Sequence, residues 1–282
     1  MSSLVCSAGS FEVRVHLSNQ YGKPVAIAPL HILDGPISPY GRLVLLILIV
    51  ITTACFQHYL NAKGTCTFLD PHEHTSDVID DAFIRATSDL NKYLIANPEL
   101  AEAYQAVCSL LIDIALLTLL YLGTTRRSSV RPFLSILIFF TFRFIAQVAA
   151  VIPCSPGFMW PVGKIYGYEI PTVFVDYEPT NDMFFSGHAG TTFIIGLEFF
   201  ALDYHRLAWF QMTFALPVIS VWVVTARAHR GIDVWAGVLA AIASCSIAKE
   251  LAVPLDRELQ VSRRIRRAAK VRREREHIDK VK

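Results

Sequence analysis

The chain has 282 residues, of which 53% are hydrophobic and 18% are charged, and its mean hydropathy is +0.42. Soluble domains have a lower mean hydropathy, and several windows here reach the roughly 20 apolar residues needed to cross a bilayer. We therefore expect one polytopic membrane domain and exclude a pair of soluble domains. The net charge of +2 says little, because the charged residues are unevenly distributed.

The N-terminal residues are mixed in character and lack the basic-then-apolar pattern of a cleavable signal peptide. We interpret 1–41 as a cytosolic N-terminal segment, 42–255 as the membrane domain, and 256–282 as a basic cytosolic tail. The membrane domain is expected to be an all-α bundle of six transmembrane helices. The predicted spans are 42–60, 106–122, 132–152, 188–203, 207–227 and 232–251.

Lysine and arginine in the connecting segments predict the orientation, because cytosolic loops are enriched in both. Basic residues occur between spans two and three (Arg126, Arg127, Arg131), between spans four and five (Arg206), and throughout the tail. In a six-span chain these three segments share one side, which we assign to the cytosol. The opposite, lumenal side then holds the acidic segment 61–105 and two short motifs.

Each motif lies at the edge of an apolar stretch. The first is Asp182-Met183-Phe184-Phe185-Ser186-Gly187-His188, and the second is His229-Arg230-Gly231-Ile232-Asp233. On a helix, His229 and Asp233 would share a face, where the carboxylate fixes the imidazole tautomer and frees the other ring nitrogen to attack. His188 would begin a separate helix and serve as acid or base. This set suits phosphoryl transfer through a histidine at a membrane surface.

Other side chains are candidates for binding phosphate oxygens. Arg227 and Arg230 flank the predicted nucleophile, and Ser186 lies where helix N-terminal amides attract anions. Charge inside a bilayer is costly and usually paired or functional; the apolar windows contain three such residues, Asp113, Arg143 and Glu198. For Arg143 two alternatives are open: a structural pair with Asp113, or substrate binding.

Asp70-Pro71-His72-Glu73-His74 offers metal-capable side chains, but no further ligand set with fitting spacing follows. We interpret this segment as a solvated loop and expect neither a metal nor another cofactor. The basic tail favours attraction to anionic lipid over nucleic-acid binding. The sequence leaves homodimer formation open.

The two motifs resemble the signature motifs of sphingomyelin synthases, members of the type 2 phosphatidic acid phosphatase superfamily. The resemblance lies in Asp182-x-x-x-Ser186-Gly187-His188 and in His229-x-x-x-Asp233-Val234, and it covers roughly residues 130–250. Arg227, two residues before the second histidine, also resembles an arginine of the plant phosphatidylcholine:diacylglycerol cholinephosphotransferase.

The resemblance implies a six-span fold in the endoplasmic reticulum or Golgi membrane with a lumenal active site. It implies that His229 is the nucleophile, that Asp233 orients it, and that His188 exchanges protons with the substrates. Asp182 becomes a substrate-binding candidate on the same ground. The implied reaction moves a phospho-alcohol head group, in the first instance phosphocholine, from a glycerophospholipid such as phosphatidylcholine to ceramide or diacylglycerol through a phosphohistidine.

Two other functions are open. A lipid phosphatase or phospholipase C-like hydrolase would use the same site with water as the acceptor. Parts of the phosphatase pattern are missing, because its first lysine is replaced by Thr124 and the serine of its Ser-Arg pair by Val223. A non-enzymatic membrane protein of the same fold is the other alternative, and its weakness is that both histidines and Asp233 are present.

Overall fold

The computed structural model describes residues 5–7, 10–12, 51, 81–125, 129–149, 155–173 and 184–281, with side chains described up to residue 257. The chain divides into two compact units, Met1–Pro36 and Ile37–Lys282. In the first unit, β1 (Val5–Ser7) and β2 (Ser10–Glu12) form an antiparallel pair. The second unit is mostly helical and contains the two motif histidines, His188 and His229.

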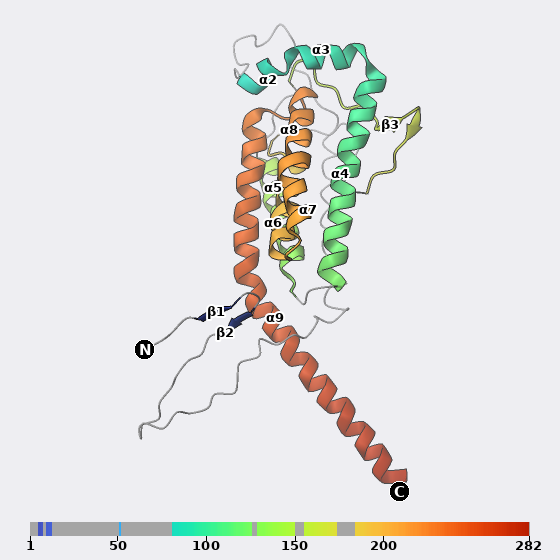
Figure 1. Cartoon of the computed structure of the whole chain (residues 1–282), viewed down its shortest axis with the longest axis vertical. Helices are drawn as coiled ribbons and strands as arrows, with labels where there is room; N and C mark the ends of the chain where they lie inside the picture. Colours follow the sequence, from blue (N-terminus) through green and yellow to red (C-terminus); the bar gives the residue numbers. More distant parts are fainter. Residues whose placement is uncertain are drawn as a thin grey trace. The chain divides into compact units, whose positions relative to one another are not determined.

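From α4 onward, the helices of the second unit run alternately up and down one bundle (Figure 1). The helices are α2 (Ala82–Ala86), α3 (Ser88–Ala96), α4 (Pro98–Thr125), α5 (Arg131–Ala149), α6 (Gly187–Ala201), α7 (His205–Phe210), a π-helical turn η1 (Gln211–Ala215), α8 (Leu216–Thr225) and α9 (Gly231–Val281). A small hairpin of β3 (Lys164–Ile165) and β4 (Tyr168–Glu169) lies beside α4 (Figure 1). The predicted helical architecture is confirmed for this part of the chain.

The helix ends follow local sequence signals. Proline opens α4 at Pro98 and stands second in α5 at Pro132, where its missing N–H costs nothing. Ser186 caps α6, because its Oγ accepts a hydrogen bond from the Ala189 N–H at 3.3 Å. Just past the end of α6, Asp203 adopts a left-handed backbone with φ 65°. That geometry ends the helix and turns the chain into α7.

Four helical segments among the described residues are long and apolar enough to cross a membrane: Pro98–Thr125, Arg131–Ala149, His205–Thr225 and Gly231–Arg257. They overlap predicted spans two, three, five and six and fit an integral membrane protein. Predicted span four forms α6, whose 15 residues give a length of about 22 Å, short of the roughly 30 Å hydrocarbon core. Predicted span one, 42–60, lies outside the described residues except for Ile51. The count of six spans therefore stays a prediction.

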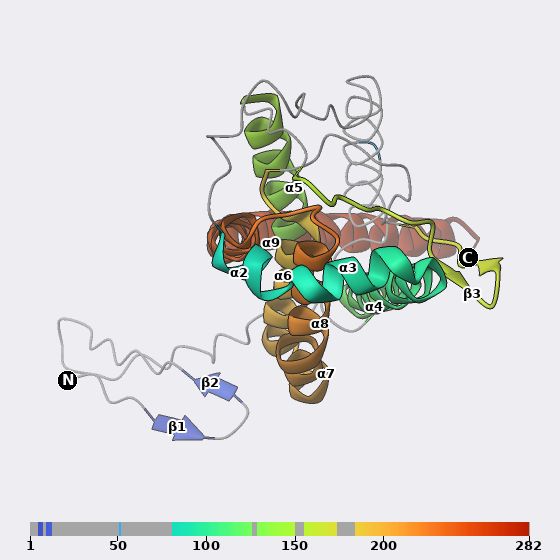
Figure 2. The same cartoon turned by 90° about the horizontal axis from the view of Figure 1, so that it is seen from above.

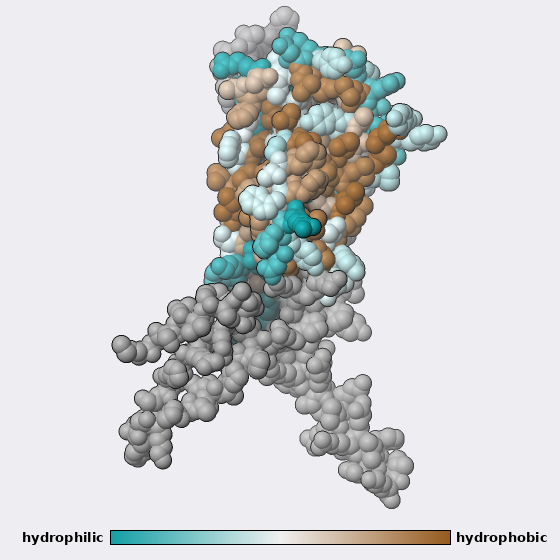
Figure 3. Space-filling view, in the orientation of Figure 1, coloured by the Kyte–Doolittle hydropathy of each residue, from teal (hydrophilic) through white to brown (hydrophobic). Residues whose placement is uncertain are grey.

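The surface of the bundle is divided into apolar and polar zones. Apolar side chains cover the flank over α4, α8 and α9, whereas polar ones gather over α2 and α3 at one end and again near the opposite end (Figure 3). A bundle that spans a bilayer requires an apolar flank between two polar ends.

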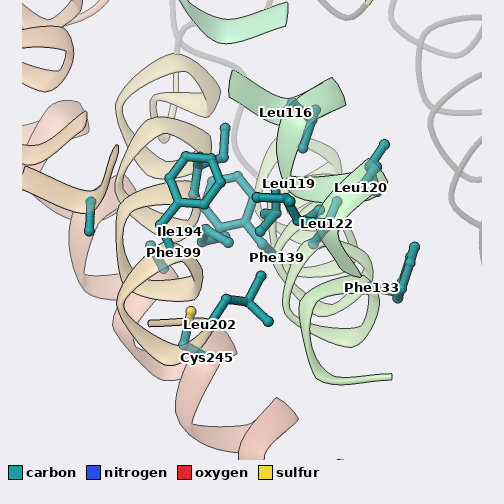
Figure 4. Packing of buried hydrophobic residues seen from close by; sticks show 14 of the residues in the cluster. Leu116, Leu119, Leu120, Leu122, Phe133, Phe139, Ile194, Phe199, Leu202 and Cys245 are labelled. Carbon is teal, nitrogen blue, oxygen red and sulfur yellow. The ribbon is translucent and has the colours of Figure 1, made fainter. Parts of the chain in front are cut away.

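The central helix is α6, which packs against α4, α5, α7, α8 and α9. Most of its residues are buried. Its Ile194 and Phe199 join Phe139 of α5 and Leu119 of α4 in the main hydrophobic core (Figure 4). A helix buried on all sides by protein does not have to match the thickness of the bilayer, which explains why α6 can be short.

Two glycines bring α6 and α9 into backbone contact. A Cβ on Gly237 of α9 would lie 2.5 Å from the Ser186 carbonyl oxygen, and a Cβ on Gly190 of α6 would lie 2.9 Å from the Gly237 carbonyl oxygen. Small residues allow such close approach between helices in membranes. Both helices begin at a histidine motif, so this contact also fixes the distance between the motifs.

The buried charge predicted at residue 198 is paired. Glu198 Oε1 lies 3.2 Å from Arg131 Nε and accepts a hydrogen bond from Ser135 Oγ at 2.8 Å. Both partners belong to the first turns of α5, and Glu198 itself is fully buried near the end of α6. The pair therefore joins α5 to the central helix at the end of the bundle remote from the motifs.

Replacing Glu198 with alanine is expected to lower the stability of the bundle by about 2 kcal/mol or more, because the Arg131 charge and the Ser135 hydroxyl lose their buried partner. The midpoint of thermal unfolding in detergent micelles measures the effect. Glu250→Ala is the matched control, since Glu250 is an exposed glutamate on α9. Equal midpoints for the two variants would contradict the structural role of the pair.

The last helix crosses the predicted domain boundary at 255/256. α9 continues without a break from Gly231 to Val281, with Pro254 inside it. The assignment of 256–282 as a cytosolic tail stays a prediction. The predicted metal-capable loop and Asp182 lie outside the described residues, as does almost all of 1–41.

Candidate active site

The two motifs meet at one end of the bundle. His188 stands at the start of α6, and His229 precedes the start of α9; their ring centroids are 6.3 Å apart with an interplanar angle of 60°. The backbones are also linked, because the Ser186 N–H donates to the Asp233 carbonyl oxygen at 3.0 Å. Segments separated by about forty residues thus place two imidazoles side by side.

Asp233 connects the same two segments through its side chain. The carboxylate is buried in the first turn of α9, and its Oδ2 accepts a hydrogen bond from the Arg230 N–H at 2.8 Å. The N–H of Phe185, from the first motif, also donates to this carboxylate. A negative charge here is favoured by the N-terminal end of the helix dipole. The predicted hydrogen bond from His229 to Asp233 stays a prediction.

His188 is half-buried, and both of its ring nitrogens are inaccessible to solvent. In the described part of the chain neither nitrogen has a hydrogen-bond partner. The indole of Trp160 lies edge-on to the imidazole, with ring centroids 5.3 Å apart. Since no described side chain fixes its tautomer, the imidazole can either give or take a proton.

Arg143 of α5 lies against the start of α6. A Cβ on Gly187 would be 2.4 Å from the carbon of the guanidinium, so the guanidinium packs directly against the backbone of α6 and a larger residue at 187 would displace it. Arg143 and His188 line one small cavity of about 40 Å³. One turn further along α5, Gln147 is buried, and neither atom of its amide has a partner among the described residues. Sequence reasoning missed Gln147 because an amide within an apolar window carries no charge signal.

Asp113, the predicted partner of Arg143, accepts a hydrogen bond from the Val173 N–H at 2.7 Å through Oδ2. That bond ties α4 to the segment after the β3–β4 hairpin. The structural pair with Arg143 stays a prediction, and so does the substrate-binding alternative.

Left-handed backbone occurs at a residue other than glycine within the first motif and again two residues before the second motif. Phe185 has φ 69° and Arg227 has φ 60°. This region is disfavoured for side chains with a Cβ, and residues held in it cluster at functional sites. Arg227 is buried, and its Nη1 donates to Thr87 Oγ1 at 3.1 Å. The strained turn therefore carries a cation into contact with the beginning of α3.

Cationic groups accompany the carboxylates of Asp233 and Asp81 at this end of the bundle. The amide ends of α6 and α9 converge there, and three arginines (Arg143, Arg227 and Arg230) belong to the same end of the bundle. Ser186 is fully buried and acts as the cap of α6; its predicted contact with substrate stays a prediction. Helix N-termini and guanidinium groups both favour phosphate oxygens.

Short helices that sequence reasoning missed cover this end of the bundle. α2 and α3 lie across the ends of α8 and α9 (Figure 2), within the segment interpreted as an acidic loop. Asp81 Oδ2 accepts from the Gly231 N–H at 2.6 Å, and its Oδ1 accepts from the Phe83 N–H at 2.8 Å. Asn91 Nδ2 donates to the carbonyl oxygens of Thr225 at 2.8 Å and Gly157 at 3.0 Å. These contacts hold both sides of the His229 turn.

An N-cap signal for α2 was present in the sequence, since Asp81 directly precedes the first helical residue, Ala82. The contacts of Asp81 and Asn91 with distant backbone had no such signal, because they join atoms 66 to 150 residues apart.

Asp81→Ala is expected to lower stability by about 1–2 kcal/mol, because the starts of two helices lose their acceptor at once. Thermal unfolding measures the loss, and hydrogen exchange at the Gly231 amide should become faster. Asp89→Ala is the control, since Asp89 is exposed on α3 and makes only a 3.9 Å surface contact with Lys92. If the two variants unfold and exchange alike, Asp81 does not hold the turn.

Within residues 81–257, apart from the gaps in that range, no group of three or more histidine, cysteine, aspartate or glutamate side chains is placed to hold a metal ion. The imidazoles of His188 and His229 lie near the buried carboxylate of Asp233 and at the same end of the bundle as three arginines.

A family model described as AtPDCT1/2, the phosphatidylcholine:diacylglycerol cholinephosphotransferase family, matches residues 79–250. The match begins just before Asp81, so it includes α2 and α3 as well as both histidines. Comparison with curated proteins and with solved structures gave no significant match. Because the matched region exceeds half of the 282-residue chain, the protein belongs to the AtPDCT1/2 family of cholinephosphotransferases.

Proposed function

We propose that the protein transfers phosphocholine from phosphatidylcholine to diacylglycerol within a membrane, through a phosphohistidine intermediate. The observation that carries the proposal is the pair of imidazoles 6.3 Å apart at the converging ends of α6 and α9. One phosphorus atom can contact both rings at that separation. Family membership supports the choice of reaction.

The first half-reaction begins with attack by a ring nitrogen of His229 on the phosphorus of phosphatidylcholine. The bond between phosphorus and the glycerol oxygen breaks, and His188 gives its proton to that oxygen. Diacylglycerol leaves, and phosphocholine remains attached to His229. Asp233 stabilises the positive charge on the His229 ring, as a carboxylate beside an imidazole does.

In the second half-reaction, the neutral His188 takes the proton from the hydroxyl of an acceptor. The acceptor oxygen attacks phosphorus, the bond between phosphorus and the His229 nitrogen breaks, and the new phospholipid leaves. The arginines of the site and the two helix N-termini stabilise the charge that develops on the phosphate oxygens in both steps. Diacylglycerol is the acceptor that the family match supports, and ceramide is the alternative that follows from the resemblance to sphingomyelin synthases.

The position of Trp160 supports choline as the head group of the substrate. A quaternary ammonium has no hydrogen-bond donor, and proteins recognise it through the faces of aromatic rings. The Trp160 indole is half-buried and adjacent to His188, at a distance that a phosphocholine bound to the neighbouring histidine can reach.

We place the reaction on the lumenal face of the endoplasmic reticulum or Golgi membrane. The starts of α5 and α7, with Arg131 and Arg206, lie at the end of the bundle opposite to the histidines. Cytosolic segments are enriched in basic residues, so the histidine end faces away from the cytosol.

A hydrolase with the same site is the second candidate function, and the cover formed by α2 and α3 disfavours it. Transfer to a lipid competes with transfer to water, and enclosure of the site lowers the access of water. The inaccessible nitrogens of His188 support such enclosure.

The test is an assay with purified protein, choline-labelled phosphatidylcholine and either unlabelled diacylglycerol or ceramide. To make transfer to diacylglycerol visible, the acceptor carries acyl chains that differ from those of the donor. Label in a phosphatidylcholine with the chains of the acceptor supports the proposal. Label only in sphingomyelin assigns ceramide as the acceptor, release of free phosphocholine makes the protein a hydrolase, and the absence of any product overturns an enzymatic function.

A further inference from the structure

An apolar cavity of about 440 Å³ lies between α8 and α9. Its walls include Val221 of α8 and Gly231, Trp235 and Val238 of α9, and Phe83 and Thr87 lie at one end. We refer to it as the α8–α9 cavity. Its volume falls within the roughly 300–1,000 Å³ typical of ligand sites.

This cavity opens on the flank that faces the bilayer. The segments that contain α8 and α9 are both candidate membrane spans. Trp235 is 58% exposed and Val221 is 42% exposed, although both line the cavity. Apolar side chains exposed on a membrane span are in contact with lipid, so the opening is accessible from the hydrocarbon of the bilayer.

The same cavity reaches the candidate active site at its other end. Gly231 lines it and follows directly after the second motif's His229-Arg230. Thr87 lines it too, and the Thr87 hydroxyl accepts the hydrogen bond from the Arg227 guanidinium. This end of the apolar cavity therefore lies next to the Arg227 guanidinium and to the Asp81 carboxylate, which accepts from the Gly231 N–H. The guanidinium is the group there that a phosphate at the end of an acyl chain would contact.

We propose that the α8–α9 cavity binds one acyl chain of the phosphoglyceride donor, with the phosphate end of that lipid toward Arg227. The inference rests on the proposed function and adds to it the place at which the donor enters. The donor is favoured over diacylglycerol because only the donor carries a phosphate that the Arg227 guanidinium can bind. Chain length then becomes a determinant of affinity, because each methylene buried in the cavity adds to binding.

The kinetic test fills the cavity with Val238→Phe in the full-length protein and compares it with Leu239→Phe. Leu239 is the neighbouring residue on α9, is 63% exposed and does not line the cavity. Each variant is assayed with choline-labelled dioleoylphosphatidylcholine and with dihexanoylphosphatidylcholine at saturating diacylglycerol. The midpoint of thermal unfolding is recorded to verify folding.

Val238→Phe should raise KM for the long-chain donor about tenfold, equivalent to about two buried methylenes. KM for the short-chain donor and kcat for both donors should stay within about twofold, and Leu239→Phe should match the wild type. The proposal is overturned if Val238→Phe leaves the long-chain KM unchanged, or if it raises KM equally for both chain lengths.

A binding experiment tests occupation of the cavity independently of whether the proposed transfer reaction occurs. A phosphatidylcholine with a photoreactive diazirine near the end of one acyl chain is crosslinked to the wild type, to both α9 variants and to His229→Ala, which lacks the proposed nucleophile. Labelled peptides from α8 and from the first turns of α9, with labelling reduced by Val238→Phe alone, support the cavity even if no transfer occurs. Labelling concentrated on α4 and α5 would overturn it, whatever the activity of the protein.

Discussion

Replacing His229 with alanine is expected to reduce transfer of phosphocholine by about three orders of magnitude or more, because the variant lacks the nitrogen that attacks phosphorus. The acid-labile adduct formed from choline-labelled phosphatidylcholine in a single turnover should disappear as well. Both effects follow from the position of this imidazole, 6.3 Å from that of His188 and beside two helix N-termini. Initial rates and acid-quenched protein-bound label are the measurements.

His205→Ala is the matched control for this experiment. His205 is exposed at the start of α7, at the opposite end of the bundle, where its ring packs near Phe200 at 5.9 Å. Its removal should leave transfer within about twofold of the wild type, as surface substitutions usually do. Retention of near-wild-type transfer by His229→Ala would eliminate the phosphohistidine mechanism, and an adduct that survives in this variant would place the nucleophile elsewhere.

Gly237→Ala is expected to be nearly as damaging, although Gly237 touches no reacting group. The added Cβ would lie 2.5 Å from the Ser186 carbonyl oxygen and 3.3 Å from the Gly190 nitrogen, both of which are backbone atoms that cannot rotate away. Overpacking of this kind costs about 1–3 kcal/mol and is relieved by separation of the helices. Separation of α6 from α9 moves His188 away from His229, so transfer should fall at least about a hundredfold, as small misplacements of reacting groups cause.

Gly123→Ala is the matched control, because the structure accommodates a Cβ at that position. A Cβ at Gly123 of α4 would lie 3.5 Å from the Phe133 ring, an ordinary contact, and alanine is the better helix former by about 1 kcal/mol. This control should keep its activity and unfold at the same or a slightly higher temperature. If Gly237→Ala also kept wild-type transfer, the backbone contact would not set the distance between the two histidines.

Much of the bundle could be predicted from the sequence because the signals are local. Apolar windows bounded by proline or by polar residues predict α5 and α7–α8 within a few residues of their observed ends. They also predict α4 and α9, although α4 begins eight residues before the predicted span and α9 continues well beyond the predicted end at 251. The alternation of spans then predicts that His188 and His229 share one end, and the structure places their rings side by side. Neither step needs knowledge of tertiary contacts.

The cover of the site could not be predicted in the same way. α2 and α3 are short and polar, so hydropathy does not distinguish them from a loop. Their role depends on Asp81 and Asn91 reaching the backbone of Gly231 and Thr225, contacts that only the folded chain creates. Catalytic roles for His188, His229 and Asp233 stay proposals, because proximity alone does not identify a nucleophile.

The length of α9 has a consequence for experiments on sidedness. Its 51 residues correspond to about 77 Å of helix, more than twice the roughly 30 Å thickness of a hydrocarbon core. A helix that begins at one membrane face therefore projects far into the aqueous phase beyond the other. Digestion of an epitope at its last turn by a protease added outside sealed microsomes would assign that phase to the cytosol. Since α9 starts at the histidine pair, the same digestion would also assign the compartment in which the pair is found.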